Sequence, residues 1–165
     1  MTTHHDYPQD LSLLIDGEWL PAGRRAVRPV LNPATAIPLA DLPLADAADL
    51  DRALDAAQRA FNHWRHSALD ERSRVLKGAA RLLRERADTI ARHATLEQGK
   101  PLADARGEVM GSAALFDFHA DECQCVPGRE LPRPPGRRAT IMHEPVGPVA
   151  AFAPWNFPLH NPARK

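Results

Sequence analysis

The amino-acid sequence predicts an α/β fold, and three observations support this prediction. Apolar residues flank Asp16-Gly17, which indicates an early β-hairpin. Apolar residues then recur at helical spacing between positions 46 and 122. A nearly continuous apolar run follows over positions 146–153, and such a run is typical of a strand buried on both faces of a parallel sheet.

The composition is that of a globular protein and excludes several function classes. Hydrophobic residues make up 44% of the 165 positions and charged residues 25%, which argues against disorder. Lys and Arg number 21, as do Asp and Glu, so no net field attracts nucleic acid or an anionic membrane. The polar start shows no signal peptide, and no apolar run is long enough to span a bilayer. We therefore expect a cytoplasmic protein with a flexible tail over residues 1–10.

Metal and disulfide chemistry have weak candidates only. His4 and His5 could bind a metal loosely, but a mobile tail is the simpler interpretation. Cys123 and Cys125 are too few and too close for a disulfide framework, which favours a reducing compartment. As a Cys-x-Cys pair they could bind a soft metal, yet no other ligand cluster stands beside them. We favour thiols without a ligand and predict no metal site.

The elements follow in order along the chain. Strands over 13–15 and 18–20 form the hairpin, a turn over 32–35 comes next, and a short strand covers 39–42. Asp46 is the expected N-cap of a first helix, and Ser67 that of a second. A third helix runs from 88 to 97 and ends at Gly99. A fourth runs from 102 to about 122.

The chain changes character after residue 126. Prolines and glycines over 127–138 predict an extended excursion, and 139–144 its returning strand. The apolar run over 146–153 comes next, and Pro158 suits the first turn of a final helix. A parallel strand needs a neighbour and a crossover connection, and neither follows within the sequence. Val146, Val149, Phe152 and Trp155 would each gain roughly 2 kcal/mol from full burial. The sequence thus reads as a truncated part of a larger fold.

A family resemblance rests on the segment Glu144-Pro-Val-Gly-Pro-Val-Ala-Ala-Phe-Ala-Pro-Trp-Asn-Phe-Pro158. Ile15–Trp19, Asn32–Thr35 and Leu96–Pro101 agree with it in order and spacing. The chain resembles NAD(P)-dependent aldehyde dehydrogenases over nearly all residues after Leu11, and is closest in style to succinate-semialdehyde dehydrogenases.

The resemblance implies the N-terminal portion of that fold. It assigns 11–126 to the hairpin and helical part of the cofactor-binding domain, and 127–144 to strands that build oligomers, the full-length relatives being homo-oligomers. It assigns 145–165 to the incomplete start of a Rossmann-like cofactor domain. A loop with a hairpin is the alternative for 127–144.

In that family a cysteine thiolate attacks the aldehyde, hydride passes to the nicotinamide of NAD or NADP, and a glutamate-activated water releases the acid. Asn156 matches the asparagine whose amide stabilises the tetrahedral oxygen. A turn or cap residue is the alternative. Ala153, Pro154, Trp155 and Asn156 match positions at the nicotinamide end of the cofactor. An aromatic plug at the end of a core strand is the alternative for Trp155.

Three further residues are assigned by the same resemblance. Lys165 matches a lysine that relays a proton, although a terminal lysine is otherwise solvated. Arg164 matches an arginine that grips the distal carboxylate of semialdehydes, and Phe157 falls in the substrate pocket. Arginine at this position also occurs in relatives that oxidise small hydroxyaldehydes, and an exposed helix arginine is the ordinary alternative. His160 and Pro162 depart from the family pattern.

The family's phosphate-binding turn, glutamate base and nucleophilic cysteine are absent, since Cys123 and Cys125 precede Asn156. We therefore expect this chain alone to be inactive, and NAD cannot be told from NADP. The alternative function is an oligomerisation partner of a full-length subunit. A nucleic-acid module built on Arg81, Arg84, Arg86 and Arg92 is disfavoured, because acidic residues interleave with these arginines.

Overall fold

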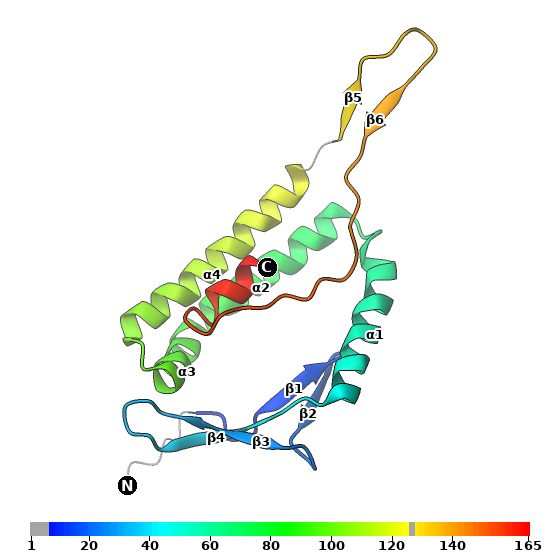
Figure 1. Cartoon of the computed structure of the whole chain (residues 1–165). Helices are drawn as coiled ribbons and strands as arrows, with labels where there is room; N and C mark the ends of the chain where they lie inside the picture. The colour runs from blue at the N-terminus through cyan, green and yellow to red at the C-terminus, as the bar shows by residue number, and fades with distance from the viewer. Residues whose placement is uncertain (1–6, 126–127) are drawn as a thin grey trace.

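The computed structural model describes residues 7–125 and 128–165 of the chain. Short strands occupy the N-terminal part, helices the middle, and a projecting hairpin, an extended segment and a short helix the remainder (Figure 1). His4, His5 and Pro127 lie outside the described residues. Of the tail expected over residues 1–10, Tyr7 is buried and its hydroxyl donates to Glu97 Oε2 at 2.6 Å, whereas Pro8, Gln9 and Asp10 are exposed.

The first hairpin is confirmed. β1 (Ser12–Ile15) pairs antiparallel with β2 (Glu18–Pro21), and Leu14 lies opposite Trp19. Asp16 and Gly17 have φ of 55° and 79°, the two positive values that a type I′ turn needs.

A second hairpin joins β3 (Val27–Leu31) to β4 (Pro38–Pro43), with a bulge between Val30 and Leu31. β4 contains the predicted strand at 39–42, whereas β3 was not expected. The turn at 32–35 is confirmed, because the buried Asn32 side chain accepts from the Ala34 amide at 2.9 Å.

Helix α1 (Ala47–Trp64) begins as predicted at Asp46, which forms a capping box with Asp49. Helix α2 (Leu69–Glu85) does not begin at a Ser67 cap, so that prediction is wrong. Its N-cap is Ala68, with no side-chain bond. The Ser67 hydroxyl instead donates to the Trp64 carbonyl at 2.8 Å and accepts from Arg72 Nε, so it closes the preceding turn.

Helices α3 (Ala87–Gln98) and α4 (Leu102–Glu122) pack with α2 into the main core. The buried cluster there consists mostly of alanines, which let the helix backbones approach closely: Ala87, Ala91, Ala94, Ala105 and Val109. Gly99 ends α3 with φ 76°, as predicted. A short 3-10 turn, η1 (Cys123–Cys125), follows α4.

Strands β5 (Arg129–Leu131) and β6 (Ala139–Ile141) form a hairpin that projects away from the helices (Figure 1). β6 falls within the predicted returning strand. Neither strand pairs with another element in the described part of the chain.

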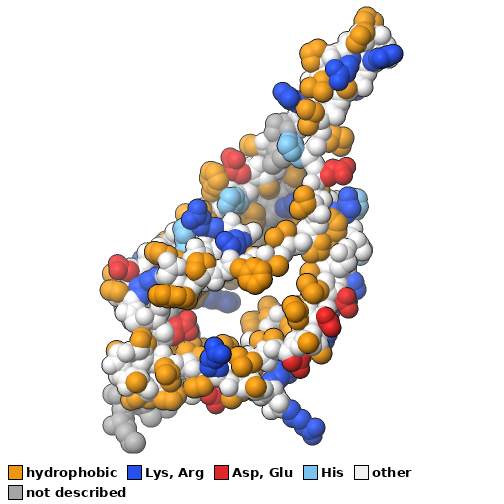
Figure 2. Space-filling view, viewed as in Figure 1, with side chains coloured by type: hydrophobic (Ala, Val, Ile, Leu, Met, Phe, Trp, Pro, Cys, Tyr) orange, Lys and Arg blue, Asp and Glu red, His pale blue; other side chains and the backbone are white. Residues whose placement is uncertain are grey.

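The expected strand over 146–153 does not form; the structure keeps this segment extended but unpaired. Val146 is 95% exposed and Phe152 85% exposed. Apolar side chains are exposed to solvent along this extended segment (Figure 2). The physical reason is that no strand of the described chain runs beside it to accept its backbone hydrogen bonds.

The chain then turns into helix α5 (His160–Arg164), which packs on α4 (Figure 1). The Asn161 amide donates to the Phe157 carbonyl at 3.0 Å across the turn that leads into α5. Pro158 was predicted to lie in the first turn of this helix, but it precedes the N-cap residue, Leu159, so that prediction is wrong. In the described residues, no helix combines the length and the apolar character that crossing a bilayer requires.

Candidate functional site

The turn that carries Asn156 lies against the corner between α3 and α4. Gln98 Nε2 donates to the Trp155 carbonyl. Lys100 Nζ donates to the Asn156 carbonyl at 3.2 Å, and the same ammonium lies 4.4 Å from the centroid of the Phe157 ring. Side chains from the α3–α4 corner thus hold three consecutive residues of the turn.

Glu108 of α4 is the buried charge beneath this turn. Its Oε1 accepts from the backbone N–H groups of Leu159 at 2.9 Å and His160 at 3.0 Å, and its Oε2 pairs with Lys100 Nζ. The Glu108 and Lys100 side chains are 3% and 15% exposed. Burial alone would raise the pKa of Glu108, but the bonds from Lys100 and the two amides outweigh it and lower that pKa.

Asn156 presents its side-chain amide outward. The residue is exposed, and its Oδ1 lies 3.4 Å from Asn161 Nδ2. Asn161 Nδ2 also lies 3.5 Å from the Pro154 carbonyl. Within the part of the chain that the structure describes, the Asn156 amide nitrogen donates to no protein acceptor. That nitrogen is therefore available to a ligand oxygen.

The residues expected near the cofactor are neighbours of Asn156 and are accessible. Ala153, Pro154 and Trp155 are all exposed. Trp155 is 81% exposed, so it plugs no core among the described residues. Its side chain and Pro158 line an open hollow of about 430 Å³ together with Val30, Glu97 and Gln98.

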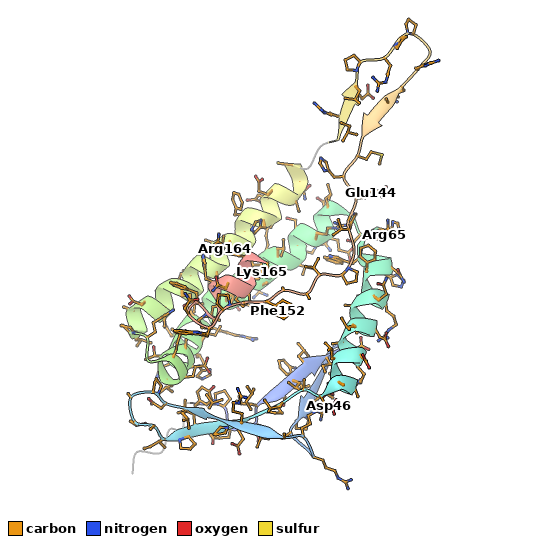
Figure 3. The ribbon with its side chains drawn as sticks, in the orientation of Figure 1. Asp46, Arg65, Glu144, Phe152, Arg164 and Lys165 are labelled. Atoms are coloured by element: carbon orange, nitrogen blue, oxygen red, sulfur yellow. The ribbon has the colours of Figure 1, made fainter. Side chains whose placement is uncertain are left out.

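Arg164 and Lys165 lie at the end of α5, beside α4, and both are exposed (Figure 3). Phe152, in contrast, belongs to the extended segment. Phe157 is 49% exposed, with Lys100 over its ring. The structure thus brings Trp155, Asn156 and Phe157 together, and neither Arg164 nor Lys165 forms an ion pair with a described residue.

Sequence reasoning missed the role of Lys100 and Glu108. Lys100 belongs to the quoted motif Leu96–Pro101 but received no function. Glu108 shares the buried face of α4 with Ala105 and Ser112 at helical spacing. A carboxylate on a buried face needs a partner, and that signal could have identified it.

Cys123 and Cys125 are free thiols at the C-terminal end of α4. Cys123 comes directly after the end of α4 and follows Glu108 by 15 residues, which corresponds to about 22 Å at the helical rise per residue. Cys123 Sγ donates to the Ala120 carbonyl at 3.1 Å. Neither thiol is placed to attack a carbonyl held at Asn156. Among the described residues, no cluster of three or more His, Cys, Asp or Glu could hold a metal ion.

Comparison with known proteins places this arrangement in a family. The Aldehyde dehydrogenase family matches residues 19–165. The chain is 50% identical over 155 residues to 4-(hydroxymethyl)benzenesulfonate dehydrogenase TsaD1 of Comamonas testosteroni, covering 93% of this chain and 32% of that protein. It is 39% identical over 153 residues to succinate-semialdehyde dehydrogenase [NADP(+)] GabD of Escherichia coli K12, covering 92% and 32%.

Solved structures agree with the sequence relatives. Succinate-semialdehyde dehydrogenase from Burkholderia pseudomallei superposes with a TM-score of 0.88 at 37% identity, over 100% of this chain and 34% of that one. The chain spans about a third of the length of the curated relatives it matches. The architecture matches the N-terminal part of their fold, and the resemblance inferred from the Pro-Trp-Asn-Phe-Pro run is confirmed. This chain belongs to the aldehyde dehydrogenase family.

Proposed function

We propose that this chain forms the N-terminal part of an enzyme that oxidises an aldehyde to a carboxylic acid with NAD⁺ or NADP⁺. The observation that carries the proposal is the Asn156 turn: an anchored backbone with an exposed amide nitrogen that no described acceptor occupies. When a thiolate adds to an aldehyde, the carbonyl oxygen becomes an oxyanion. Asn156 Nδ2 is the donor we assign to that oxygen.

The residues beside Asn156 fit the nicotinamide end of the cofactor. The Trp155 indole is 81% exposed and offers a flat surface next to the turn, so a planar ring can pack on it and on the backbone at 153–154. The cofactor, when bound, supplies the hydride acceptor. Ala153, Pro154 and Trp155 would orient the cofactor. We assign to Lys165 the relay of a proton.

We further propose that the substrate is an aldehyde with an anionic group, and that Arg164 and Phe157 contact it. The names of four relatives support an anionic substrate. Two are named for the semialdehydes of dicarboxylic acids, succinate and glutarate. Two are named for sulfonates, 4-(hydroxymethyl)benzenesulfonate and 3-sulfolactaldehyde. The exposed Arg164 guanidinium can bind either group through two hydrogen bonds.

The 165-residue chain alone should not oxidise aldehydes. Asn156 is exposed, and an oxyanion donor is strong only where water is excluded. The two thiols lie at the other end of α4. We also infer a cytoplasmic location, where such thiols stay reduced.

The test measures NAD(P)H formation by two preparations: the 165-residue chain, and the polypeptide translated from the same gene with its downstream coding sequence. Substrates are succinate semialdehyde, 4-formylbenzenesulfonate and uncharged butanal. We expect turnover only by the longer polypeptide and only with the anionic aldehydes. There Asn156→Ala should lower kcat about 100- to 1000-fold. Arg164→Met should raise KM for succinate semialdehyde and leave KM for butanal unchanged. Turnover by the chain alone, or a preference for butanal, overturns the corresponding proposal.

An interaction role is the second candidate. The β5–β6 hairpin projects from the helices, and the outer edge of each strand is unpaired in the described chain (Figure 1). We propose that this hairpin joins subunits, either of the same protein or of a longer relative. Gel filtration should then show a dimer or larger species, which Thr140→Pro, a change that removes one backbone donor of β6, converts to monomers. A monomeric unaltered chain would count against it.

A further inference from the structure

We propose that Lys100 and Glu108 are positioning residues for Asn156, a role that rests on the function proposed above. They do not touch the reacting atoms themselves. Their ion pair holds the backbone on both sides of residues 157–158, and thereby fixes the direction in which the Asn156 amide points.

Glu108 anchors the C-terminal side of the turn. One carboxylate oxygen accepts from two successive amides, Leu159 and His160, at the start of α5. α5 has five residues and cannot be stable as an isolated helix, so its position depends on what holds its first turn. A carboxylate suits this place because the free N–H groups and the helix dipole favour negative charge.

Lys100 anchors the other side. Its ammonium pairs with Glu108, donates to the Asn156 carbonyl at 3.2 Å and lies over the Phe157 ring. The Glu108 side chain is 3% exposed, and a buried carboxylate is costly unless it is paired. The lysine therefore neutralises the anchor and links it directly to Asn156. Loss of either charge leaves the other buried and unpaired.

An apolar contact alone would not give the same control. Leu159 packs against the alanine-rich cluster of the main core, which keeps α5 near α4. Such a contact is non-directional and permits small rotations. Hydrogen bonds to two amides and one carbonyl are directional. An oxyanion donor needs this precision, because a misplacement of about 1 Å can cost about 100-fold in rate.

The first test follows backbone amide exchange by NMR in the 165-residue chain. Glu108→Ala should speed exchange at Leu159 and His160 by about tenfold or more. Glu108→Gln keeps an acceptor of the same shape and should restore part of the protection. Lys100→Met should shift the side-chain amide resonances of Asn156. The matched control is Lys77→Met, which removes the exposed pair between Lys77 and Asp121 at 2.8 Å, and it should change neither signal.

The second test is kinetic and uses the longer polypeptide. Lys100→Met and Glu108→Gln should lower kcat at least tenfold while KM for NAD(P)⁺ stays within about twofold. Unchanged exchange and unchanged kcat in these variants overturn the positioning role, provided that Asn156→Ala still lowers kcat. If Asn156→Ala has no effect on kcat while the exchange changes appear, the proposed function fails instead. Glu108→Gln keeps the experiment decisive if Glu108→Ala does not fold.

Discussion

Two valines in this chain are chemically identical but differ completely in their surroundings. Val109 of α4 is 0% exposed and belongs to the buried cluster with Ala91 and Ala105. Val146 of the extended segment is 95% exposed. The substitutions Val109→Ala and Val146→Ala remove the same two methyl groups, one pair from the core and one from water. The difference between the two effects therefore reports the burial of Val109, reduced by the helix propensity that alanine gains in α4.

The expected magnitude follows from the structure. Two methyl groups at about 0.8 kcal/mol each give about 1.6 kcal/mol of lost burial for Val109→Ala. The surrounding alanines have no rotamers with which to fill the space, so a cavity remains and the total rises to about 2 kcal/mol. For a chain of this size the melting temperature should fall by about 4–8 °C. Val146→Ala should change the free energy of unfolding by less than about 0.5 kcal/mol.

The assay is urea unfolding followed by far-ultraviolet circular dichroism, with both variants and the unaltered chain at one protein concentration. A loss of more than about 1 kcal/mol for Val146→Ala would refute the unpaired state of residues 146–153. A neutral Val109→Ala would refute the assignment of the core. In the longer polypeptide, where we propose that this segment joins a sheet, Val146→Ala should become destabilising by about as much as Val109→Ala.

Two more predictions concern the part of the chain before α4. Hydrogen bonds from Arg25 lower the pKa of Asp49 from 3.8 to about 2. This pair therefore stabilises the fold fully above pH 3.8 and progressively less as the pH falls toward 2. Asp49→Asn should flatten that part of the curve of unfolding free energy against pH, and an unchanged acid limb would contradict the ion pair. Gly99 and Gly17 both have positive φ, 76° and 79°, but an added Cβ would lie 3.0 Å from Pro33 only at Gly99. Both variants carry a backbone strain of about 1 kcal/mol. Gly99→Ala should lower the melting temperature more than Gly17→Ala, because its Cβ also crowds Pro33. Equal shifts in melting temperature would mean that the Pro33 ring moves aside without cost.

Local signals in the sequence predicted most elements correctly. The Asp16-Gly17 turn, the Asp46 cap and the Gly99 stop each act within a few residues, so the neighbouring side chains decide them. Ser67 does not cap α2 because its hydroxyl oxygen accepts from Arg72 Nε, while its O–H donates to the Trp64 carbonyl at the end of α1. β3 was missed because Arg28 and Pro29 interrupt its apolar pattern, and its pairing with β4 supplies what propensity does not.

The sequence by itself determined the family, through the Pro-Trp-Asn-Phe-Pro run, and it determined the start of α1 at Asp46 and the end of α3 at Gly99. It could not determine what holds Asn156. Lys100 and Glu108 stand 56 and 48 positions before Asn156, and only the packing of α5 on α4 brings them to one turn. Nor could the apolar run over 146–153 show whether it would be paired. A strand exists only through hydrogen bonds to a neighbour, and a neighbour is a property of the tertiary structure.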